Sequence, residues 1–504
     1  MHQQALSNHS MTDFIIIEYN ERVGGRATQA NFGKQKNGSP YAVEVGANWI
    51  QGLGKPGGPQ NPVWLLARKY GLKNTVSNYR SILTYSETGH TDYSELIDEY
   101  EKAWDKASVK AGRMLADNLQ DETARAGLSL AGWNPKHSDM RRQAVEWWKW
   151  GSFSHLEKSP NSGQKLTSDV DWETALSPEV SSLIFGAAGD NLTFNQFSGE
   201  DSLVVDPRGF RHIIEEESKT FLKANDPRLL LKTSVTHVTY SDGGVTIHNS
   251  DGSCVSAAYA ICTFSLGVLQ NNAVSFSPQL PEWKRRAISK FSIGTYTKIF
   301  MQFNETFWPE TTQFFLYASP TKRGYYPLWQ SLSAEGFLPG SNIIFATVVE
   351  DESYRVEQQT DEQTKQEMTG VLRQMFPDVA VPEPTAFMYP RWTKIPWAYG
   401  SYSNWPIGTT LEMHQNLRAN AGRLWFAGEA TSSEYFGFLH GAWFEGMEAG
   451  SQIAALLKGQ CAHIYNGTQC GERPHYETLH GTSPLEHYNV SNGWAASSFY
   501  SSSG

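Results

Sequence analysis

The sequence predicts an α/β fold in which two domains are interleaved along the chain. The chain has 504 residues, which is more than one ordinary hydrophobic core organises. Short apolar strands end in glycine-containing turns, and helical blocks are inserted between them. Hydrophobic residues make up 39% and charged residues 19%, a composition typical of a packed globular protein.

Strands are predicted where short apolar runs meet turn residues. The first covers residues 14–17 and ends at Glu18. Residues 229–256 predict a β-meander, with turns at Asp242-Gly243-Gly244 and Asp251-Gly252. The alternating pattern of residues 296–303 also predicts a strand. Further strands are predicted at 42–45, within 314–349 and at 424–427.

Three segments have the spacing of helices. Residues 94–150 set charged side chains against Leu, Ala and Trp. Residues 360–376 predict an amphipathic helix that ends before Pro377, and residues 441–458 a helix with small residues on its early turns. The Ser-rich stretch after Asn492 is expected to be disordered.

Charge and composition exclude some function classes. The formal net charge is -10 and the chain has no basic tract, which argues against a nucleic-acid partner. No apolar stretch is long enough to span a bilayer, so no membrane association is predicted. The 17 Trp, 22 Tyr and 25 Phe residues suit either an aromatic-lined pocket or a large core.

The cysteines predict no metal site, because none of the four has metal-ligand spacing. Cys461 and Cys470 flank a short polar loop and could form a disulfide. With the sequons, this pair suggests a secretory route, although the first residues hold no apolar segment of a signal peptide. Compartment and oligomeric state stay open. The sequons lie at Asn8, Asn37, Asn191, Asn304, Asn466 and Asn489.

Glu18 and the turn after it are typical of a dinucleotide-binding fold. There, an acidic residue at the end of the second strand accepts hydrogen bonds from the ribose hydroxyls. Alone, a Glu at the end of a strand is ordinary. Gly24 and Gly25 strengthen the case because they let the backbone approach a phosphate, and the Arg26 guanidinium can neutralise that phosphate in bidentate geometry.

The glycine-rich fingerprint that should precede Glu18 is not found. It is expected about 20 residues before the acid, and the first glycine of the chain is Gly24. We therefore expect the first strand, the dinucleotide loop and most of the first helix to be missing through a truncated or mispredicted start. The chain as given should then bind the dinucleotide weakly or not at all, because the pyrophosphate loses backbone donors and a helix N-terminus.

A second strand-to-turn motif lies near the end of the chain. Residues 424–427 run into Gly428-Glu429, and a helix opens near Gly441. This order would present Glu429 to a polyhydroxyl chain. The positive end of the helix would face an electron-rich group. A plain strand–helix unit explains the motif about as well.

Together with these motifs, seven strings make the chain resemble the flavin-containing amine oxidases, and most of all the plant-type polyamine oxidases, from residue 14 to residue 457. The strings are YAVEVGANWIQG, VGGR, DPRGF, SLGVLQ, YTKIF, YGSYSNWPIG and LWFAGEATSSEYFGFLHGA. The resemblance implies a Rossmann-like FAD-binding domain at 14–75, 200–285 and 390–460. It also implies a mixed-sheet substrate-binding domain at 76–199 and 286–389, followed by a tail at 461–504.

The resemblance also implies roles for individual residues. Glu18, Gly24, Gly25 and Arg26 would bind the ADP half of FAD, Val235 the adenine through its backbone, and Glu429 the ribityl chain. Trp392 would lie against the isoalloxazine, Lys298 would hold a water at flavin N5, and the rings of Tyr402 and Phe438 would sandwich the amine. Ser401 stands where some relatives tether FAD through cysteine, so the flavin should be noncovalent.

The substrate tunnel departs from the family. Plant-type polyamine oxidases carry two glutamates there, which align with Gln51 and, less securely, with Phe153. Neither residue supplies a negative charge. Glu146 or Glu157 could compensate if the alignment is shifted.

The leading hypothesis is an FAD-dependent amine oxidase that converts an amine to an imine and reduces O2 to H2O2. The alternatives are an oxidase of a less charged amine in specialised metabolism, and a truncated, flavin-free relative without activity. The amine and the C–N bond that is cleaved stay open.

Overall fold

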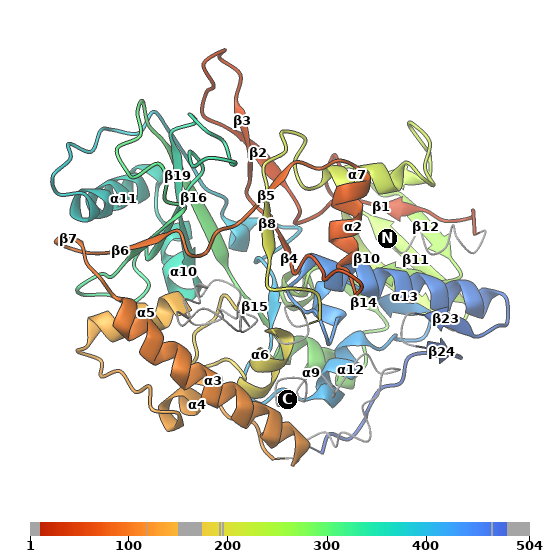
Figure 1. The fold of residues 1–504 in the computed structure, drawn as a ribbon. Helices are drawn as coiled ribbons and strands as arrows, with labels where there is room; N and C mark the ends of the chain where they lie inside the picture. Colours follow the sequence, from red (N-terminus) through yellow and green to blue (C-terminus); the bar gives the residue numbers. More distant parts are fainter. Residues whose placement is uncertain are drawn as a thin grey trace.

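A computed structural model describes residues 11–117, 119–149, 174–190, 193, 196–464 and 467–480 (Figure 1). The predicted α/β class is confirmed, since helices surround several mixed and parallel sheets. The Ser-rich stretch lies outside the described residues, and the domain boundaries stay a prediction.

The largest sheet has seven strands in the order β20-β16-β19-β18-β17-β6-β7. Every neighbouring pair is antiparallel except β17 with β6, which is parallel. Helices α10 (Glu350–Gln358) and α11 (Asp361–Met375) pack against it. The strands are β20 (Ala386–Met388), β16 (Tyr296–Gln302), β19 (Ile343–Val349), β18 (Leu328–Ser331), β17 (Phe314–Tyr317), β6 (Ile82–Ser86) and β7 (Gly89–His90).

Strand β16 is covered on both faces. On one face, Thr297 Oγ1 donates to Glu357 Oε1 of α10 at 2.9 Å. On the other, the Phe300 ring lies 5.8 Å from that of Phe32 in the hairpin β2 (Gln29–Phe32) and β3 (Tyr41–Glu44). All seven residues of β16 are buried. The strand predicted at 296–303 is therefore confirmed as β16, and a second layer covers its other face.

A second region holds two parallel strand pairs. Strand β1 (Ile16–Ile17) pairs with β9 (Leu229–Leu230), and β13 (Ala260–Cys262) pairs with β22 (Leu424–Phe426). A four-stranded sheet lies nearby, in the order β12-β11-β10-β14. Its strands are β12 (Cys254–Ala257), β11 (Gly244–Asn249), β10 (Val235–Ser241) and β14 (Ser275–Ser277), so the predicted meander and its two turns are confirmed.

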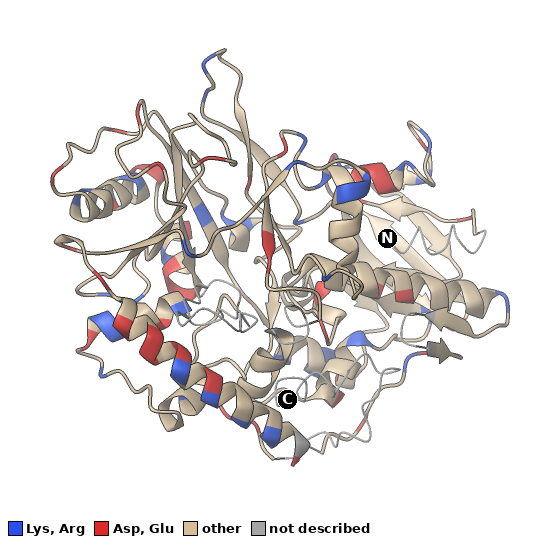
Figure 2. Cartoon of the chain, in the orientation of Figure 1, with Lys and Arg blue, Asp and Glu red and all other residues tan. Residues whose placement is uncertain are grey.

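The segment predicted to be helical at 94–150 contains three helices in its described part. These are α3 (Ser94–Ala116), α4 (Ala124–Leu130) and α5 (Met140–Lys149). Figure 2 shows acidic and basic residues alternating along α3, which fits an exposed helix face. The helix predicted at 360–376 is α11, where Thr360 forms a capping box with Gln363.

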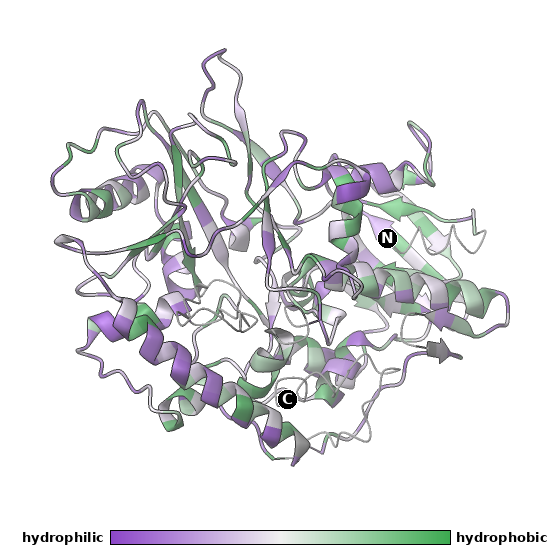
Figure 3. Ribbon diagram, viewed as in Figure 1, coloured by the Kyte–Doolittle hydropathy of each residue, from purple (hydrophilic) through white to green (hydrophobic). Residues whose placement is uncertain are grey.

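Helix α13 (Leu439–Leu457) matches the predicted last helix. It carries few charges (Figure 2), and Figure 3 shows hydrophobic residues along it. No helix within the described part of the chain is long and apolar enough to cross a membrane. Cys461 and Cys470 form the predicted disulfide.

The remaining elements connect these layers. A three-stranded sheet has the order β4-β8-β5, and β15 pairs with β21 and β23 with β24. The strands are β4 (Trp49–Gln51), β8 (Asp201–Val204), β5 (Asn74–Val76), β15 (Ser292–Ile293), β21 (Ser403–Asn404), β23 (Ala462–Ile464) and β24 (Gly467–Gln469). The helices are α2 (Pro62–Lys69), α6 (Leu183–Asp190), α7 (His212–Ser218), α8 (Leu266–Gln270), α9 (Glu282–Lys290), α12 (Leu411–Arg418), η2 (Trp392–Lys394) and η3 (Glu429–Thr431).

Candidate functional site

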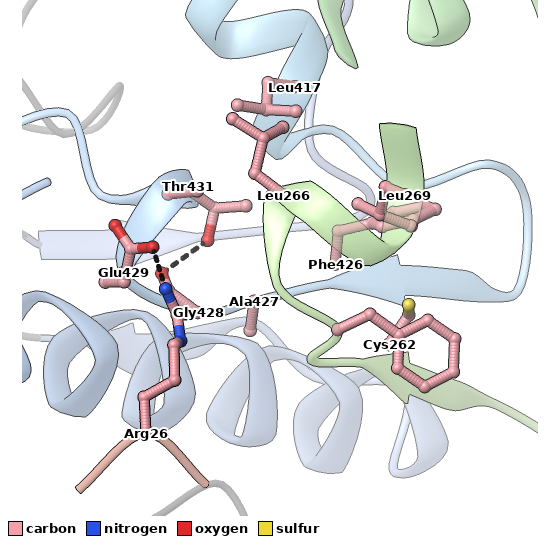
Figure 4. Close-up of a pocket in the computed structure, with 12 residues that line it drawn as sticks. Arg26, Cys262, Leu266, Leu269, Leu417, Phe426, Ala427, Gly428, Glu429 and Thr431 are labelled. Atoms are coloured by element: carbon pink, nitrogen blue, oxygen red, sulfur yellow. Dashed lines mark hydrogen bonds and ion pairs between the residues drawn. The ribbon is translucent and has the colours of Figure 1, made fainter. Parts of the chain in front are cut away.

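A cavity lies where β13 and β22 end, and Figure 4 shows the residues that line it. Apolar side chains from β13, α8, β22 and the end of α12 form one side. Arg26 and Glu429 form the polar side, joined in Figure 4 by a dashed line. The lining residues are Arg26, Cys262, Phe264, Leu266, Leu269, Leu417, Phe426, Ala427, Gly428, Glu429, Ala430 and Thr431.

Arg26 and Glu429 are 403 residues apart in sequence and are paired in space. Arg26 Nη1 donates to Glu429 Oε1 and to the Ser401 carbonyl, both at 2.8 Å. The second oxygen of Glu429 accepts from Ser403 Oγ at 2.5 Å and from Gly437 N at 2.8 Å. These contacts hold the carboxylate and the guanidinium in fixed orientations at the cavity.

Two backbone features leave donor groups open to a ligand. Gly428 has a φ of 142°, and an added Cβ would meet no atom within 4 Å, so a group can approach this backbone closely. Helix α13 begins after Phe438, which makes no side-chain cap hydrogen bond. The first N–H groups of the helix and its positive dipole end can therefore act on an electron-rich group.

Glu18 and the start of the meander lie side by side. Glu18 N donates to the Leu230 carbonyl at 2.8 Å, and Thr233 N donates to the Glu18 carbonyl at 3.0 Å. This brings Glu18 close to Val235, at the first position of β10. The Glu18 carboxylate accepts from the backbone N and the side-chain amide of Asn20, both at 2.8 Å. The structure thus places two of the predicted cofactor residues together.

Lys298 is not a surface lysine, which is the ordinary interpretation of a lysine in an alternating strand. Its exposed fraction is 1%. Nζ donates to the Gly46 carbonyl at 2.5 Å, and the Tyr296 ring centroid lies 6.0 Å away. Burial lowers the pKa of the Lys298 ammonium to about 7, while the negative charge of Glu44 opposes that shift.

Trp392 is buried, with an exposed fraction of 2%, and a residue that sequence reasoning missed holds its backbone in place. Glu357 is fully buried and accepts from Trp392 N at 3.0 Å, Thr393 N at 2.9 Å and Thr297 Oγ1 at 2.9 Å. Because Thr297 precedes Lys298 in β16, Glu357 connects the Trp392 turn to the lysine strand. No local motif marks Glu357, since its partners lie in other elements.

Tyr402 and Phe438 come together although 35 residues separate them. A Cβ on Gly437 would lie 3.5 Å from Cδ2 of Tyr402, so this ring packs against the residue before Phe438. The Tyr402 ring also lies 6.0 Å from that of Tyr296. Phe438 stacks on the His440 ring with centroids 5.1 Å apart. Tyr402 therefore packs beside the residue that precedes Phe438, and their predicted joint role stays a prediction.

His440 and Asn61 support this site and were not predicted. Burial lowers the pKa of His440 to about 3, so the ring is neutral. Its Nδ1 lies 3.2 Å from Asn61 Nδ2, which donates to the Gln51 carbonyl at 2.7 Å. Asn61 also caps α2 by accepting from Val63 N at 2.8 Å. One amide thus links Gln51 to the ring on which Phe438 stacks.

Glu146 is not available to replace the tunnel acids. It is fully buried and ion-paired with Arg125. Trp133 Nε1 donates to it at 3.0 Å, and Arg323 lies 3.5 Å away. Its charge is already neutralised. Phe153 and Glu157 lie outside the described residues.

Asp201 is an acid that sequence reasoning missed beside Gln51. The two residues are register partners across β4 and β8, so their side chains lie on the same face. Asp201 Oδ1 accepts from Gly52 N at 3.0 Å, and Oδ2 accepts from Tyr79 Oη at 2.9 Å. Both carboxylate oxygens are therefore engaged within the protein.

Comparison with known sequences decides which family has this arrangement. The model of the family described as flavin containing amine oxidoreductase matches residues 4–454. The chain belongs to this family. Polyamine oxidase 1 of Zea mays is 36% identical over 477 residues, covering 92% of this chain and 89% of that protein. Polyamine oxidase 7 of Oryza sativa subsp. japonica is 36% identical over 458 residues, covering 88% of this chain and 90% of that protein.

Solved amine oxidases share the fold. Wild-type putrescine oxidase bound to putrescine has a TM-score of 0.66 at 15% identity, over 90% of this chain and 96% of that chain. Cyclohexylamine oxidase from Brevibacterium oxydans has a TM-score of 0.65 at 17% identity, over 91% of this chain and 96% of that chain. At these identities the likeness concerns the fold alone.

This chain is thus a flavin-dependent amine oxidase, and its cofactor is FAD. The residues at the cavity fit that cofactor, because they offer open backbone at Gly428 and a fixed carboxylate and guanidinium. The N-terminus of α13, which has no side-chain cap, follows Gly437, whose backbone N donates to Glu429. FAD supplies the two-electron acceptor of the reaction. The individual roles given to Glu18, Arg26, Val235, Trp392 and Glu429 stay predictions.

Proposed function

We propose that this enzyme oxidises an amine with few remote positive charges, such as an acetylated polyamine or a monoamine, to an imine and reduces O2 to H2O2. The proposal rests on the neutral side chain of Gln51, which the resemblance to plant-type polyamine oxidases aligns with a tunnel glutamate. Glu146, a candidate to replace that charge, is neutralised by Arg125.

The aromatic site supports amine oxidation. Tyr402 and Phe438 contribute half-buried rings, and ring faces attract an approaching ammonium by cation–π interaction. The amine must lose its proton before its α-carbon can give up a hydride equivalent. A site of low polarity favours that loss because it disfavours the charged form. The buried neutral ring of His440 adds no positive charge that would repel the substrate.

The reaction balances without another reactant. Bound FAD would supply the two-electron acceptor, so that the α-carbon could lose a hydride equivalent while the nitrogen lone pair forms the C=N bond of the imine. O2 then accepts two electrons and two protons to give H2O2. In this proposal, Lys298 would hold a water beside the bound flavin. Its Nζ has one acceptor among the described residues, the Gly46 carbonyl, so two of its three N–H donors remain for such a water.

The cost of burying unpaired ammonium groups determines which substrate we expect the enzyme to prefer. Burying each remote ammonium of a spermine-like amine without a partner costs several kcal/mol. Gln51 can accept a hydrogen bond but supplies no charge. Asp201 is the closest alternative, but its two oxygens already accept hydrogen bonds from Gly52 N and Tyr79 Oη. A substrate with a single amine at the aromatic site avoids the cost.

The test measures H2O2 release from the flavin-loaded enzyme with spermine, spermidine, N-acetylated spermine and a monoamine. We expect a higher kcat/KM for the acetylated polyamine or the monoamine. Gln51→Glu should move the preference toward spermine by about tenfold, the effect of roughly 1.4 kcal/mol from a hydrogen bond to a charged group. Gln366→Glu on α11 adds the same charge at an exposed position. It should leave unchanged the ratio of kcat/KM for spermine to kcat/KM for the acetylated polyamine or the monoamine.

Two outcomes contradict the substrate proposal. One is a wild-type enzyme that already prefers spermine. The other is an equal change in the preference for spermine in Gln51→Glu and Gln366→Glu, since an equal change would reflect net charge alone. If spermine is preferred and Asp201→Asn removes the preference, then Asp201 supplies the charge that Gln51 lacks. A flavin-loaded enzyme that releases no H2O2 with any amine contradicts the proposed reaction.

A further inference from the structure

The register of β16 brings Lys298 over the end of β3. The even-numbered side chains of this strand face the β2–β3 hairpin, where Gln302 Oε1 accepts from Lys34 N at 2.8 Å. Lys298 continues this row and donates to the Gly46 carbonyl at 2.5 Å. Glu44 is the last residue of β3, two positions before Gly46. The packing of the hairpin on the sheet therefore places a lysine and a glutamate in the same buried layer.

Glu44 is a buried acid with only one oxygen satisfied. Its exposed fraction is 8%, and Oε1 accepts from Phe210 N at 2.7 Å. Oε2 is buried and accepts no hydrogen bond from the described residues. Burial raises the pKa of Glu44 to about 7, and the positive charges of Lys298 and then Arg211 oppose that shift. A carboxylate at this place needs a nearby cation to stay ionised.

Among the charged groups that act on Glu44, Lys298 favours the ionised carboxylate most. Arg211 acts less strongly than Lys298, and its Nη2 donates to Thr28 Oγ1 at 3.2 Å. Asp206 is the acid that opposes ionisation of Glu44, and it is itself paired with Arg208 at 2.7 Å. For Lys298, burial favours the neutral amine, and the negative charge of Glu44 favours the ammonium.

The backbone of Gly46, whose carbonyl accepts from Lys298, is held in place by close packing on Arg26. A Cβ on Gly46 would lie 1.7 Å from the Arg26 carbonyl oxygen, so this segment packs tightly on the chain that carries Arg26. Ala47 N donates to the same carbonyl at 3.2 Å. The acceptor of Lys298 is thus fixed relative to the cavity residue Arg26.

We propose that Glu44 is a positioning residue for Lys298, the buried counter-charge that keeps its ammonium protonated beside the Gly46 carbonyl. The inference deepens the proposed function, on which it rests for the catalytic task of Lys298. Moving one proton from Lys298 to Glu44 leaves the net charge of the pair unchanged. Without the carboxylate, burial alone acts on Lys298 and favours the neutral amine.

The direct test follows the Lys298 titration in protein labelled with [ε-13C]lysine, with and without FAD. The resonance absent from Lys298→Met identifies the residue. In wild type we expect a midpoint near pH 7. Glu44→Gln should lower it by at least about one unit, as loss of a nearby opposite charge does. Glu44→Asp keeps the charge one methylene farther away and should give a value between the two.

A matched control separates charge from general disturbance. Glu217 is another buried glutamate with a lysine partner, Lys69, at 2.5 Å on α7 and α2. Glu217→Gln should leave the Lys298 midpoint unchanged. In the flavin-loaded enzyme, the pH limb of the flavin half-reaction that depends on Lys298 should move to lower pH in Glu44→Gln, by the same amount as the resonance.

An unshifted Lys298 midpoint in Glu44→Gln overturns the inference. If that variant does not fold, an unshifted midpoint in Glu44→Asp does so. Neither result touches the proposed function, which fails instead when the flavin-loaded wild type releases no H2O2 from any amine. The two failures are therefore distinguishable.

Discussion

Replacing Arg473 with Met should strongly destabilise the fold, because Arg473 belongs to a buried network of two positive and two negative charges. Its side chain is 1% exposed and lies 3.3 Å from both Glu445 and Glu448. Arg418, 2% exposed, pairs with the same two glutamates. Arg473 Nη1 also donates to the Phe426 carbonyl at 2.9 Å, at the end of the strand that leads to Glu429.

Met keeps much of the volume and removes the charge, which leaves two buried glutamates with one arginine. Removing one partner from a buried ion pair costs about 3–5 kcal/mol. We expect a loss of that size in the free energy of unfolding, measured by urea titration followed by tryptophan fluorescence. Glu448→Gln added to Arg473→Met should recover part of it, because the network is neutral again.

Arg373→Met is the matched control. Arg373 is 57% exposed and lies 3.4 Å from Glu383, which is 74% exposed. An exposed pair of this kind contributes at most about 1 kcal/mol. A loss below about 1 kcal/mol in Arg473→Met, or no recovery in the double variant, refutes the reasoning that net charge in the network determines the cost.

Three further changes test the site. Lys298→Met should slow a flavin half-reaction about 10²- to 10⁴-fold while FAD stays bound, as loss of an acid–base group does, and stopped-flow traces equal to wild type would remove Lys298 from the mechanism. Denaturing the flavin-loaded enzyme should release free FAD, because Ser401 has no thiol; flavin that precipitates with the polypeptide contradicts this. The third change is in pH. The folded-state pKa of Lys298 is lowered from 10.5 to about 7, so between these values the unfolded chain binds more protons and the free energy of unfolding rises with pH. The folded-state pKa of Glu44 is raised from 4.5 to about 7, so stability falls as pH rises across that lower window. In Lys298→Met the rise above pH 7 should lose this contribution. Urea titrations that give the same pH dependence of the free energy of unfolding for both proteins argue against a folded-state pKa of Lys298 that burial lowers.

The sequence by itself determined the elements whose signals are local. The turns at Asp242-Gly243-Gly244 and Asp251-Gly252 follow from residue type and separate strands where expected. The Thr360 cap starts α11 because a hydroxyl can accept from the backbone N–H of Gln363 three positions later. The family strings also gave the fold class, the flavin and the amine oxidase activity.

Only the tertiary structure decided which side chains meet. Lys298 and the Gly46 carbonyl are 252 residues apart, and Arg26 and Glu429 are 403 apart. Spacing within one element carries no information on such pairs, because they depend on which face of a strand the next layer covers. For the same reason, the sequence predicted the strand at 296–303 but not that β16 is buried along its whole length. The partners of Glu146, Glu357 and Glu44 come from other elements. Only the structure therefore shows that Glu146 is ion-paired, that Glu357 accepts hydrogen bonds from backbone N–H groups, and that Glu44 lies in the same buried layer as a lysine.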